Sequence, residues 1–511
     1  MADENENKEK EIRPLFVGRL PIWASIEGFD PDNEAEILTE INEALSIHSR
    51  NIEAMDSLYW YRRGITPILA RTKEVRPNIC SKVNVSLPET IVTFKDGYFY
   101  TEPVTYVARK DEDGLSDKVA KLNDFLYRSG KQTADNKLVD WFHTVGKADL
   151  FVRSNADPEV PFKAYALDPR SAFVARSLTP EAYPVYGGYS VKRGDQIFIS
   201  VWDRNWVITL KGADSTPYAT DMPEHAAFAS EIISIDPNPL GFVPIIEYYY
   251  NSVMMSAFEQ AIPLIDAINL LQSDRLDATE QAIQSLLVFY NCELGEDDKG
   301  NPITPAMVRE SGALFLKSVG DNRADLKEII TNLDQSQCQV FIDNLYEQVL
   351  SICAMPSTGH GSHNAATANA ALILDQWYQS DTAARNTEDL FKESNAYFDE
   401  IILHILREKN ILDLDATDIT LQFVRNETAN IQSKAQAAQI LLSMGMHPEL
   451  ALGKSGVSND PVADVKMSDK YLKMIWGDPD KVDKTEEQGN GQGEAVIVER
   501  SVSEGDVGGA V

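Results

Sequence analysis

The chain has 511 residues, of which 43% are hydrophobic, so it can bury a substantial core and is expected to form about two to four domains. Its formal net charge is −32. The acidic excess is spread along the chain, which argues against a repressor, a nuclease or a coat arm that would bind DNA through Lys and Arg. No apolar run approaches the ~18 residues of a membrane-spanning helix, so we expect no membrane partner. The polar start lacks the features of a signal peptide, so we expect no secretion. The four cysteines form no CxxC motif, so we expect no disulfide or zinc framework.

The first part of the chain is predicted to contain helices on either side of a short hairpin. Apolar residues at helical spacing predict a helix over 34–63. The runs IVTF (91–94) and YFY (98–100) are separated by Asp96-Gly97, which predicts two strands joined by a turn. Two further helices are expected, at 115–128 and 133–146.

Between residues 160 and 250, short β-rich runs alternate with turns, which predicts an antiparallel sheet. A helix of ~31 residues is expected over 256–287, long for an ordinary globular domain. Pro263 should restart or kink it near its beginning. Residues 288–333 form a compact insertion, in which LLVFY and ALFLK are candidate strands.

A second long helix is predicted over 334–354, followed by the loop MPSTGHGSHN. A third helix covers 366–408, and its polar middle, QSDTAARNTED, allows a kink. The remaining expectations are a strand at 419–424, a helix at 430–446, a short helix starting at His447-Pro448-Glu449, and disorder at 1–12 and from about 483.

No motif identifies an active site. His360 and His363 in the GHGSH segment could hold a metal, but no third ligand stands at helix spacing, so a flexible loop is the preferred interpretation. The GKS run (453–455) lacks the first glycine of a phosphate-binding loop, and EDDKGN (296–301) lacks the ligand pattern of a calcium loop. None of the 79 carboxylates is singled out by spacing. We therefore predict no catalytic residue, no bound metal and no cofactor.

Four segments carry a resemblance to a known family. They are YWYRRGITPILARTK (59–73), FKDGYFYTEPVTY (94–106), GFVPIIEYYYNSVMMSAFEQAIPLIDAINLLQSD (241–274) and ITLQFVRNETANIQSKAQAAQILLSMGMHPELAL (419–452). In this order they resemble the portal proteins, or head-to-tail connectors, of long-tailed bacteriophages of Gram-positive hosts. Each segment is loose alone, but four in order over most of the chain are specific. The resemblance implies an α+β portal fold with long stem helices, a mixed α/β wing, a small clip and a helical crown.

The resemblance also implies a domain map. It comprises a flexible N-terminal arm (1–29), a wing (30–255), a first stem helix (256–287), a clip (288–333), a second stem helix (334–354), a tunnel loop (355–365), a long wing helix (366–408), a crown (409–482) and a disordered tail (483–511). The residues alone agree with the stem, because two long helices with a polar insertion between them make a hairpin. Apolar stripes on both helices would let copies pack side by side through the heterologous interfaces of a closed ring.

Portal proteins form a ring, of twelve subunits in this family, around a DNA channel at one capsid vertex, used for genome packaging, head-tail joining and genome ejection. The implied partners are other copies, the packaging motor (terminase), the head-completion adaptor, the major capsid and scaffolding proteins, and passing double-stranded DNA. The protein is expected in the virion after assembly in the host cytoplasm. The residues expected to line the narrowest passage are Ser357, Thr358, Gly359, His360, Gly361, Ser362, His363 and Asn364. Lys317 and Arg323 are clip candidates that either contact DNA or, as is usual for exposed cations, are solvated.

Three alternatives remain open. The loop after the second helix could be a surface connector without a role. The chain could be another capsid-associated structural protein, such as a minor head protein. It could also be a metal-dependent hydrolase that uses scattered carboxylates with His360 and His363.

Overall fold

The structure is a computed structural model of the whole chain, and contacts divide the chain into two compact units, Met1–Thr428 and Ala429–Val511. The residues that the structure describes are 16–74, 77–110, 114–193, 196–214, 226–283, 286–290, 292–294, 316–318, 325–329, 335–356, 368–423, 431–455, 457–458, 461 and 464–468. Among them, no helix combines the length and the apolar character needed to cross a membrane.

Helix α1 (Glu34–Arg62) confirms the first predicted helix. It begins where the side chain of Asn33 accepts a hydrogen bond from the backbone N–H of Glu36 at 3.3 Å. The first half of the helix buries Ile37, Ile41 and Leu45 against a sheet. Its second half contributes to another core, through Ile52, Met55 and Leu58. One long amphipathic helix therefore links two cores.

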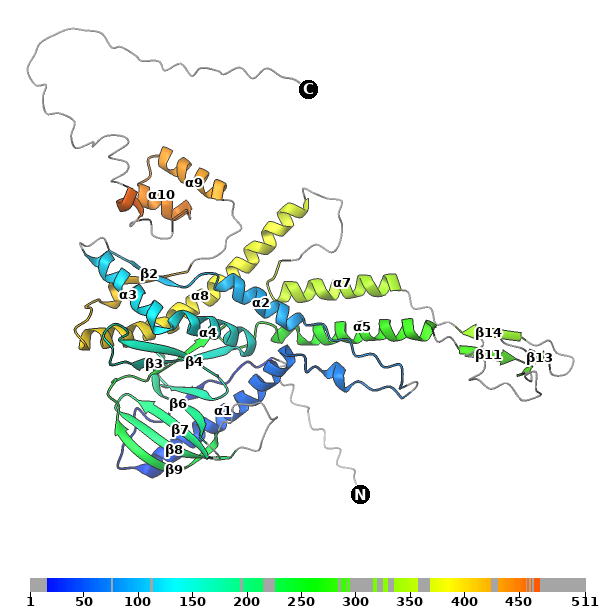
Figure 1. The fold of residues 1–511 in the computed structure, drawn as a ribbon, viewed down its shortest axis with the longest axis horizontal. Helices are drawn as coiled ribbons and strands as arrows, with labels where there is room; N and C mark the ends of the chain where they lie inside the picture. The colour runs from blue at the N-terminus through cyan, green and yellow to red at the C-terminus, as the bar shows by residue number, and fades with distance from the viewer. Residues whose placement is uncertain are drawn as a thin grey trace, which may run out of the picture. The chain divides into compact units, whose positions relative to one another are not determined.

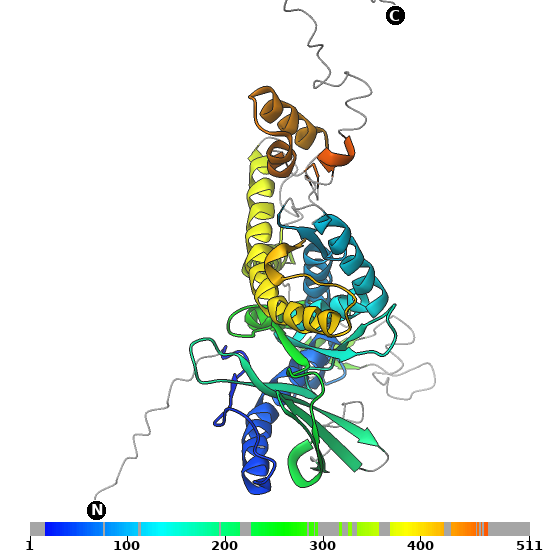
Figure 2. The same ribbon diagram turned by 90° about the vertical axis from the view of Figure 1, so that its left-hand side faces the viewer.

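The sheet against α1 has six strands in the order β1-β5-β6-β7-β8-β9. The strands are β1 (Ile22–Trp23), β5 (Ala172–Arg176), β6 (Pro184–Arg193), β7 (Gln196–Asp203), β8 (Trp206–Asp214) and β9 (Ala226–Pro237). Only β1 pairs in parallel, with β5, and the other four pairings are antiparallel. Figures 1 and 2 show α1 along one side of the sheet. The antiparallel strands predicted between residues 160 and 250 are thus confirmed, but they do not form one sheet, because Phe162–Leu167 and Ile245–Tyr249 belong to a second one.

A second, three-stranded sheet has the order β10-β3-β4. Its strands are β10 (Ile245–Tyr249), β3 (Lys147–Ser154) and β4 (Phe162–Leu167). The two predicted helices, α3 (Leu115–Ser129) and α4 (Lys131–Val145), pack with it around a core that includes Phe142, Leu150 and Phe162. Gly146 joins α4 to β3 with φ +95°, and a Cβ there would lie 1.9 Å from the carbonyl oxygen of Met254. Only glycine fits this turn.

The predicted hairpin at 91–100 is wrong, because these residues belong to helix α2 (Leu87–Phe99). The buried side chains Leu87, Ile91, Val92 and Phe99 recur at helical spacing. A four-residue apolar run such as IVTF does not distinguish a strand from a buried helix. An isolated glycine such as Gly97 lowers helix stability by only about 1 kcal/mol and does not exclude a helix. The next strand, β2 (Thr105–Ala108), pairs antiparallel with the distant β15 (Ile419–Gln422).

The two long helices after the sheets form an antiparallel hairpin (Figure 1). The first, α5 (Ile262–Ile283), follows a 3₁₀ turn (Glu259–Ala261), so Pro263 lies in its first turn, where proline costs least. The second is α7 (Gln335–Ile352). The described strands between them form two antiparallel pairs. These are β11 (Leu286–Tyr290) with β14 (Asp325–Ile329), and β12 (Cys292–Leu294) with β13 (Leu316–Ser318).

The third predicted helix is α8 (Ala368–Glu408), which bends along its length in Figures 1 and 2. Its second half buries Phe391, Phe398 and Ile402 in the core of the three-stranded sheet. In the second unit, α9 (Ile431–Ser443) ends at Gly445, which has φ +82°, and α10 (Pro448–Ser455) starts with proline. The helices α9 and α10 confirm the sequence expectation.

Candidate functional site: the stem hairpin and its strap

All eight residues predicted to form the channel loop, 357–364, lie outside the described residues, as does Arg323. The described chain on either side of the loop is anchored. The N–H of Met355 donates to the carbonyl oxygen of Leu350 at 2.8 Å. The Ser380 hydroxyl of α8 donates to the carbonyl oxygen of Ala354, also at 2.8 Å. Lys317 lies in β13 opposite Glu293 of β12. The channel loop and the clip cations therefore remain predictions.

The hairpin of α5 and α7 has an apolar interior closed by polar contacts. Ile265 and Ile268 of α5 share a buried core with Ile342, Leu345 and Val349 of α7. Farther along, the guanidinium of Arg275 donates to the side-chain oxygens of Gln335 at 3.0 Å and Gln339 at 2.7 Å. The hairpin is thus a single packed element, as expected of two long helices with an insertion between them.

The outer surface of this hairpin exposes several large apolar side chains. Side chains that are about half exposed or more stand on both helices, and they are Leu270, Leu276, Val340, Phe341 and Ile352. Apolar surface gathered on one element is typical of a protein contact surface. The hairpin therefore has surface available for packing against further helices.

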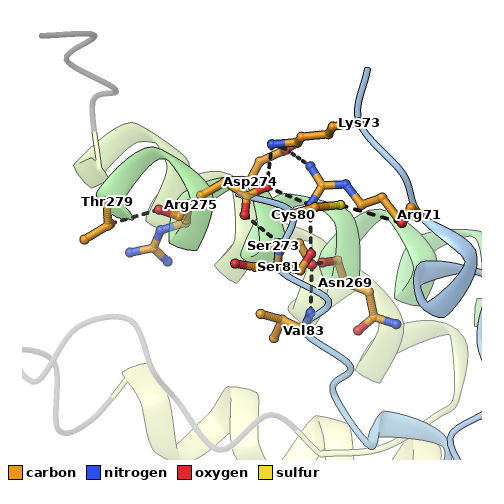
Figure 3. A network of polar contacts seen from close by, with 11 residues as sticks. Arg71, Lys73, Cys80, Ser81, Val83, Asn269, Ser273, Asp274, Arg275 and Thr279 are labelled. Carbon is orange, nitrogen blue, oxygen red and sulfur yellow. Dashed lines mark hydrogen bonds and ion pairs between the residues drawn. The ribbon is translucent and has the colours of Figure 1, made fainter. Parts of the chain in front are cut away.

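An extended segment runs along α5 and is held by one side chain from each helical turn. We call residues 71–74 and 77–85 the strap. The backbone N–H groups of Val85, Val83 and Ser81 donate to side chains of α5 at 2.8, 2.9 and 2.7 Å. The accepting atoms are Asn269 Oδ1, Ser273 Oγ and Asp277 Oδ1, in that order. Figure 3 shows Ser81 and Val83 lying beside this face of the helix.

The spacing of the strap contacts follows from backbone geometry. Two residues of an extended chain advance about 6.6 Å, and four residues of an α-helix advance about 6 Å. Alternate strap amides therefore meet successive turns of α5, at positions i, i+4 and i+8. All three accepting side chains are buried. Three side chains of α5 therefore fix the register of the strap along this helix.

Charge pairs strengthen one end of the strap. Asp277 is within 3.0 Å of an Arg71 guanidinium nitrogen and 2.5 Å of the Lys73 ammonium, and Arg71 also pairs with Asp274. Burial acts to raise the pKa of Asp277, but the hydrogen bonds from Lys73 and Ser81 outweigh it and hold the pKa below its ordinary value. Asp277 is therefore ionised and compensates two cations of the strap.

Sequence reasoning missed this contact, although a signal for it was present. Asn269, Ser273 and Asp277 are polar residues at four-residue spacing on a helix whose first half is apolar. Such a polar stripe marks a face that meets polar groups. The strap itself has no periodic pattern, so the partner of the stripe is evident only in the folded chain.

Substituting Asp277 by alanine should free the strap while leaving the fold in place. The change removes the acceptor of the Ser81 N–H and the counter-charge of Lys73. Local opening of residues 81–85 should therefore become easier by about 2–3 kcal/mol. Hydrogen exchange of the Ser81 and Val83 amides measures this. Asp277→Asn keeps an oxygen acceptor and should show a smaller increase, and unchanged exchange in the alanine variant would contradict the role of the stripe.

Comparisons with known proteins identify the family of this chain. The family model described as phage portal protein, SPP1 Gp6-like, matches residues 41–474. No curated protein matches the sequence. A solved chain described as the neck of an empty GTA particle computed with C6 symmetry is similar with a TM-score of 0.42 and 10% identity, over 73% of this chain and 90% of that chain. The family match covers most of the 511 residues, and the chain belongs to the SPP1 Gp6-like phage portal proteins.

Proposed function

We propose that this portal subunit lets double-stranded DNA slide through the channel of its ring without binding it tightly and without hydrolysing ATP. The hairpin of α5 and α7 is the main support for a ring. Its interior is packed with apolar side chains, and apolar side chains are also exposed on its outer surface, as is required of a helix pair that packs between copies. The net charge of −32 supports weak DNA contact. Arg71 and Lys73, two cations beside the stem, are already paired with carboxylates of α5.

The domain map expected from the family fits the order of the elements. The proposed wing (30–255) contains both sheets apart from the edge strand β1 (Ile22–Trp23), which falls in the proposed N-terminal arm (1–29). The proposed stem helices (256–287 and 334–354) contain α5 and α7. The strands β12, β13 and β14 fall within the proposed clip (288–333), whereas β11 begins two residues earlier, at Leu286. The proposed crown (409–482) contains β15 together with α9 and α10. We keep residues 355–365 as the tunnel loop.

The finer partners follow from this map. The clip would meet the packaging motor first and the head-completion adaptor later, and the motor would supply the ATP hydrolysis. Lys317 and Arg323 would remain solvated on the clip surface. Twelve subunits would form the ring, which would assemble in the host cytoplasm and join the capsid and scaffolding proteins at one vertex.

Negative-stain microscopy of the purified full-length protein tests the proposal. A ring with a central hole is the expected image, and mass measurement of the ring should give twelve subunits. A monomer or a shell fragment would instead favour another capsid-associated protein. Stoichiometric metal in the purified protein would favour a hydrolase that uses His360 and His363.

Replacing Gly361 by arginine should impair DNA packaging while the ring still assembles. A long cation in the tunnel loop would narrow the passage and attract phosphates that must slide past. Counting DNA-filled heads and imaging the rings separates the two effects. Gly361→Ala serves as the control and should package normally. Normal filling in the arginine variant would show that residues 357–364 do not line the passage.

A further inference from the structure

A cavity of about 310 Å³ lies beside α8 in the larger unit. Its walls come from β5, the turn that leads into β6, the strand β10 and one face of α8. Sites for small molecules typically have volumes of about 300–1,000 Å³. The cavity is therefore large enough for a small organic ligand.

The charged groups of the cavity are mostly carboxylates. Glu393 and Glu400 lie seven residues apart on α8, and Glu181 lies in the turn between β5 and β6. Within the described part of the chain, no ion pair or hydrogen bond reaches these three side chains. Arg176, a cation of the lining, is already paired with Glu247 at 3.3 Å. The cavity therefore has an excess of negative charge and suits a cationic ligand.

A buried hydroxyl in the wall is a second sign of a ligand. Ser394 lines the cavity and is 8% exposed, and its hydroxyl has no hydrogen-bond partner among the residues that the structure describes. Buried polar groups are seldom left unpaired, because an unpaired group costs stability. A ligand with N–H donors would supply the missing partner.

The uncharged part of the wall suits a ligand with a hydrocarbon chain. Three tyrosines line the cavity, and they are Tyr183, Tyr249 and Tyr397. Aromatic faces attract ammonium groups, and the guanidinium of Arg176 already lies 5.1 Å from the ring centroid of Tyr249. Between the carboxylates of α8, Ala396 leaves an apolar surface that methylene groups can cover.

The spacing of the carboxylates argues against a single metal ion. Among the described residues, no three His, Cys, Asp or Glu side chains are grouped closely enough to hold one. Glu393 and Glu400 are two helical turns apart, which is about 10 Å along α8. A cation that pairs with both carboxylates must therefore be elongated and carry more than one positive charge.

We propose that this cavity binds an aliphatic polyamine, a flexible chain of methylenes with several protonated amino groups. One ammonium pairs with Glu393 and another with Glu400, through charge-assisted hydrogen bonds. The methylenes between them lie against Ala396 and Tyr397, and the Ser394 hydroxyl accepts a hydrogen bond from an N–H of the ligand. All of these groups belong to one chain, so the site does not depend on the ring or on the passage of DNA.

Titration of the purified full-length protein with spermidine, in the absence of DNA, tests this site. Calorimetry should show saturable binding of one spermidine per chain. Glu393→Gln with Glu400→Gln should weaken this binding by roughly tenfold or more, because two charge-assisted contacts are lost. Ala396→Phe keeps every charge but fills the space between the two carboxylates, and it should weaken binding to a similar degree.

A matched pair of carboxylates separates this site from the general acidity of the chain. Asp117 and Asp124 are exposed and also lie seven residues apart, on α3. Asp117→Asn with Asp124→Asn should leave spermidine binding unchanged. Equal weakening in both double variants, or no saturable binding in the unsubstituted protein, overturns the polyamine site and leaves the portal function standing.

A ligand with a single amino group tests the elongated shape of the site. Butylamine reaches only one of the two carboxylates of α8, so it should bind about tenfold or more weakly than spermidine at the same ionic strength. Equal affinities of butylamine and spermidine would mean that the cavity accepts an isolated ammonium group, and they would overturn the assignment to a polyamine.

Discussion

Replacing Lys147 by methionine is expected to lower the free energy of unfolding of the larger unit by about 3–5 kcal/mol. Lys147 is the first residue of β3, and its ammonium lies 2.6 Å from Glu247 Oε1 and 3.3 Å from Asp149 Oδ2. Glu247 and Asp149 are directly opposite each other on β10 and β3. The side chains of all three residues are at most 7% exposed. Methionine would fill the same space and leave two buried carboxylates facing each other.

The remaining charges do not compensate for this loss. Arg176 contacts Glu247 at 3.3 Å, but among the residues that the structure describes no group other than Lys147 lies within bonding distance of the Asp149 carboxylate. Burial raises the pKa of Asp149 to about 7, against the attraction of Lys147. Without the lysine, a carboxylate must take up a proton or remain uncompensated, and either outcome costs stability.

Chemical denaturation followed by circular dichroism measures the effect of the Lys147 variant. Lys163→Met is the matched control, because Lys163 lies on the adjacent strand β4 with an exposed side chain. The control should change the free energy of unfolding by less than about 0.5 kcal/mol. A loss of under about 1 kcal/mol in Lys147→Met would show that the buried charges do not depend on this ammonium.

Substituting Asp399 by asparagine is expected to change how stability depends on pH. Asp399 lies on α8, where it accepts hydrogen bonds from the hydroxyl of Tyr106 and, at 3.0 Å, from the amide of Asn395. Burial raises the pKa of Asp399 to about 7, although the hydrogen bond from Tyr106 opposes the shift. An unperturbed aspartate has a pKa of about 3.9, so the folded chain holds this proton more tightly than the unfolded chain.

The sign of the pH effect follows from that difference. The stabilising contribution of the protonated Asp399 is fully present below about pH 4 and is lost as the pH rises through about 7. Three pKa units correspond to about 4 kcal/mol, and partial exposure of the residue reduces this to about 2–4 kcal/mol. Relative to the wild type, Asp399→Asn should therefore gain about 2–4 kcal/mol between about pH 4 and pH 8.

Comparing the two unfolding free energies at each pH cancels the other titrating groups. Asp389→Asn, an exposed carboxylate earlier on α8, is the control and should track the wild type. A constant difference between Asp399→Asn and the wild type across this pH range would mean that Asp399 is ionised throughout. The measurement thus separates the contribution of one carboxyl from the general acidity of the chain.

The local pattern of the sequence determined the elements whose signals lie within one segment. The apolar spacing of residues 34–63 predicted α1, and the end of α9 followed from Gly445, because a left-handed residue ends a helix by its own backbone preference. The helix predicted over 256–287 is shorter, at Ile262–Ile283, and the restart expected at Pro263 coincides with its first turn, after a 3₁₀ turn. The family followed from four ordered segments, which the match over residues 41–474 confirms.

Features that depend on contacts between distant segments of the chain were evident only in the tertiary structure. Residues 91–94 belong to a helix because Ile91 and Val92 are buried in a core that they share with α5 and α7. A four-residue pattern in the sequence does not contain this information. β2 finds its partner in β15, with Tyr106 opposite Leu421. The strap is held by Asn269, Ser273 and Asp277, about 190 residues away in the chain. Composition and periodicity describe neighbours in sequence, whereas the strap and the buried charges around Lys147 are stabilised by pairs that only folding brings together.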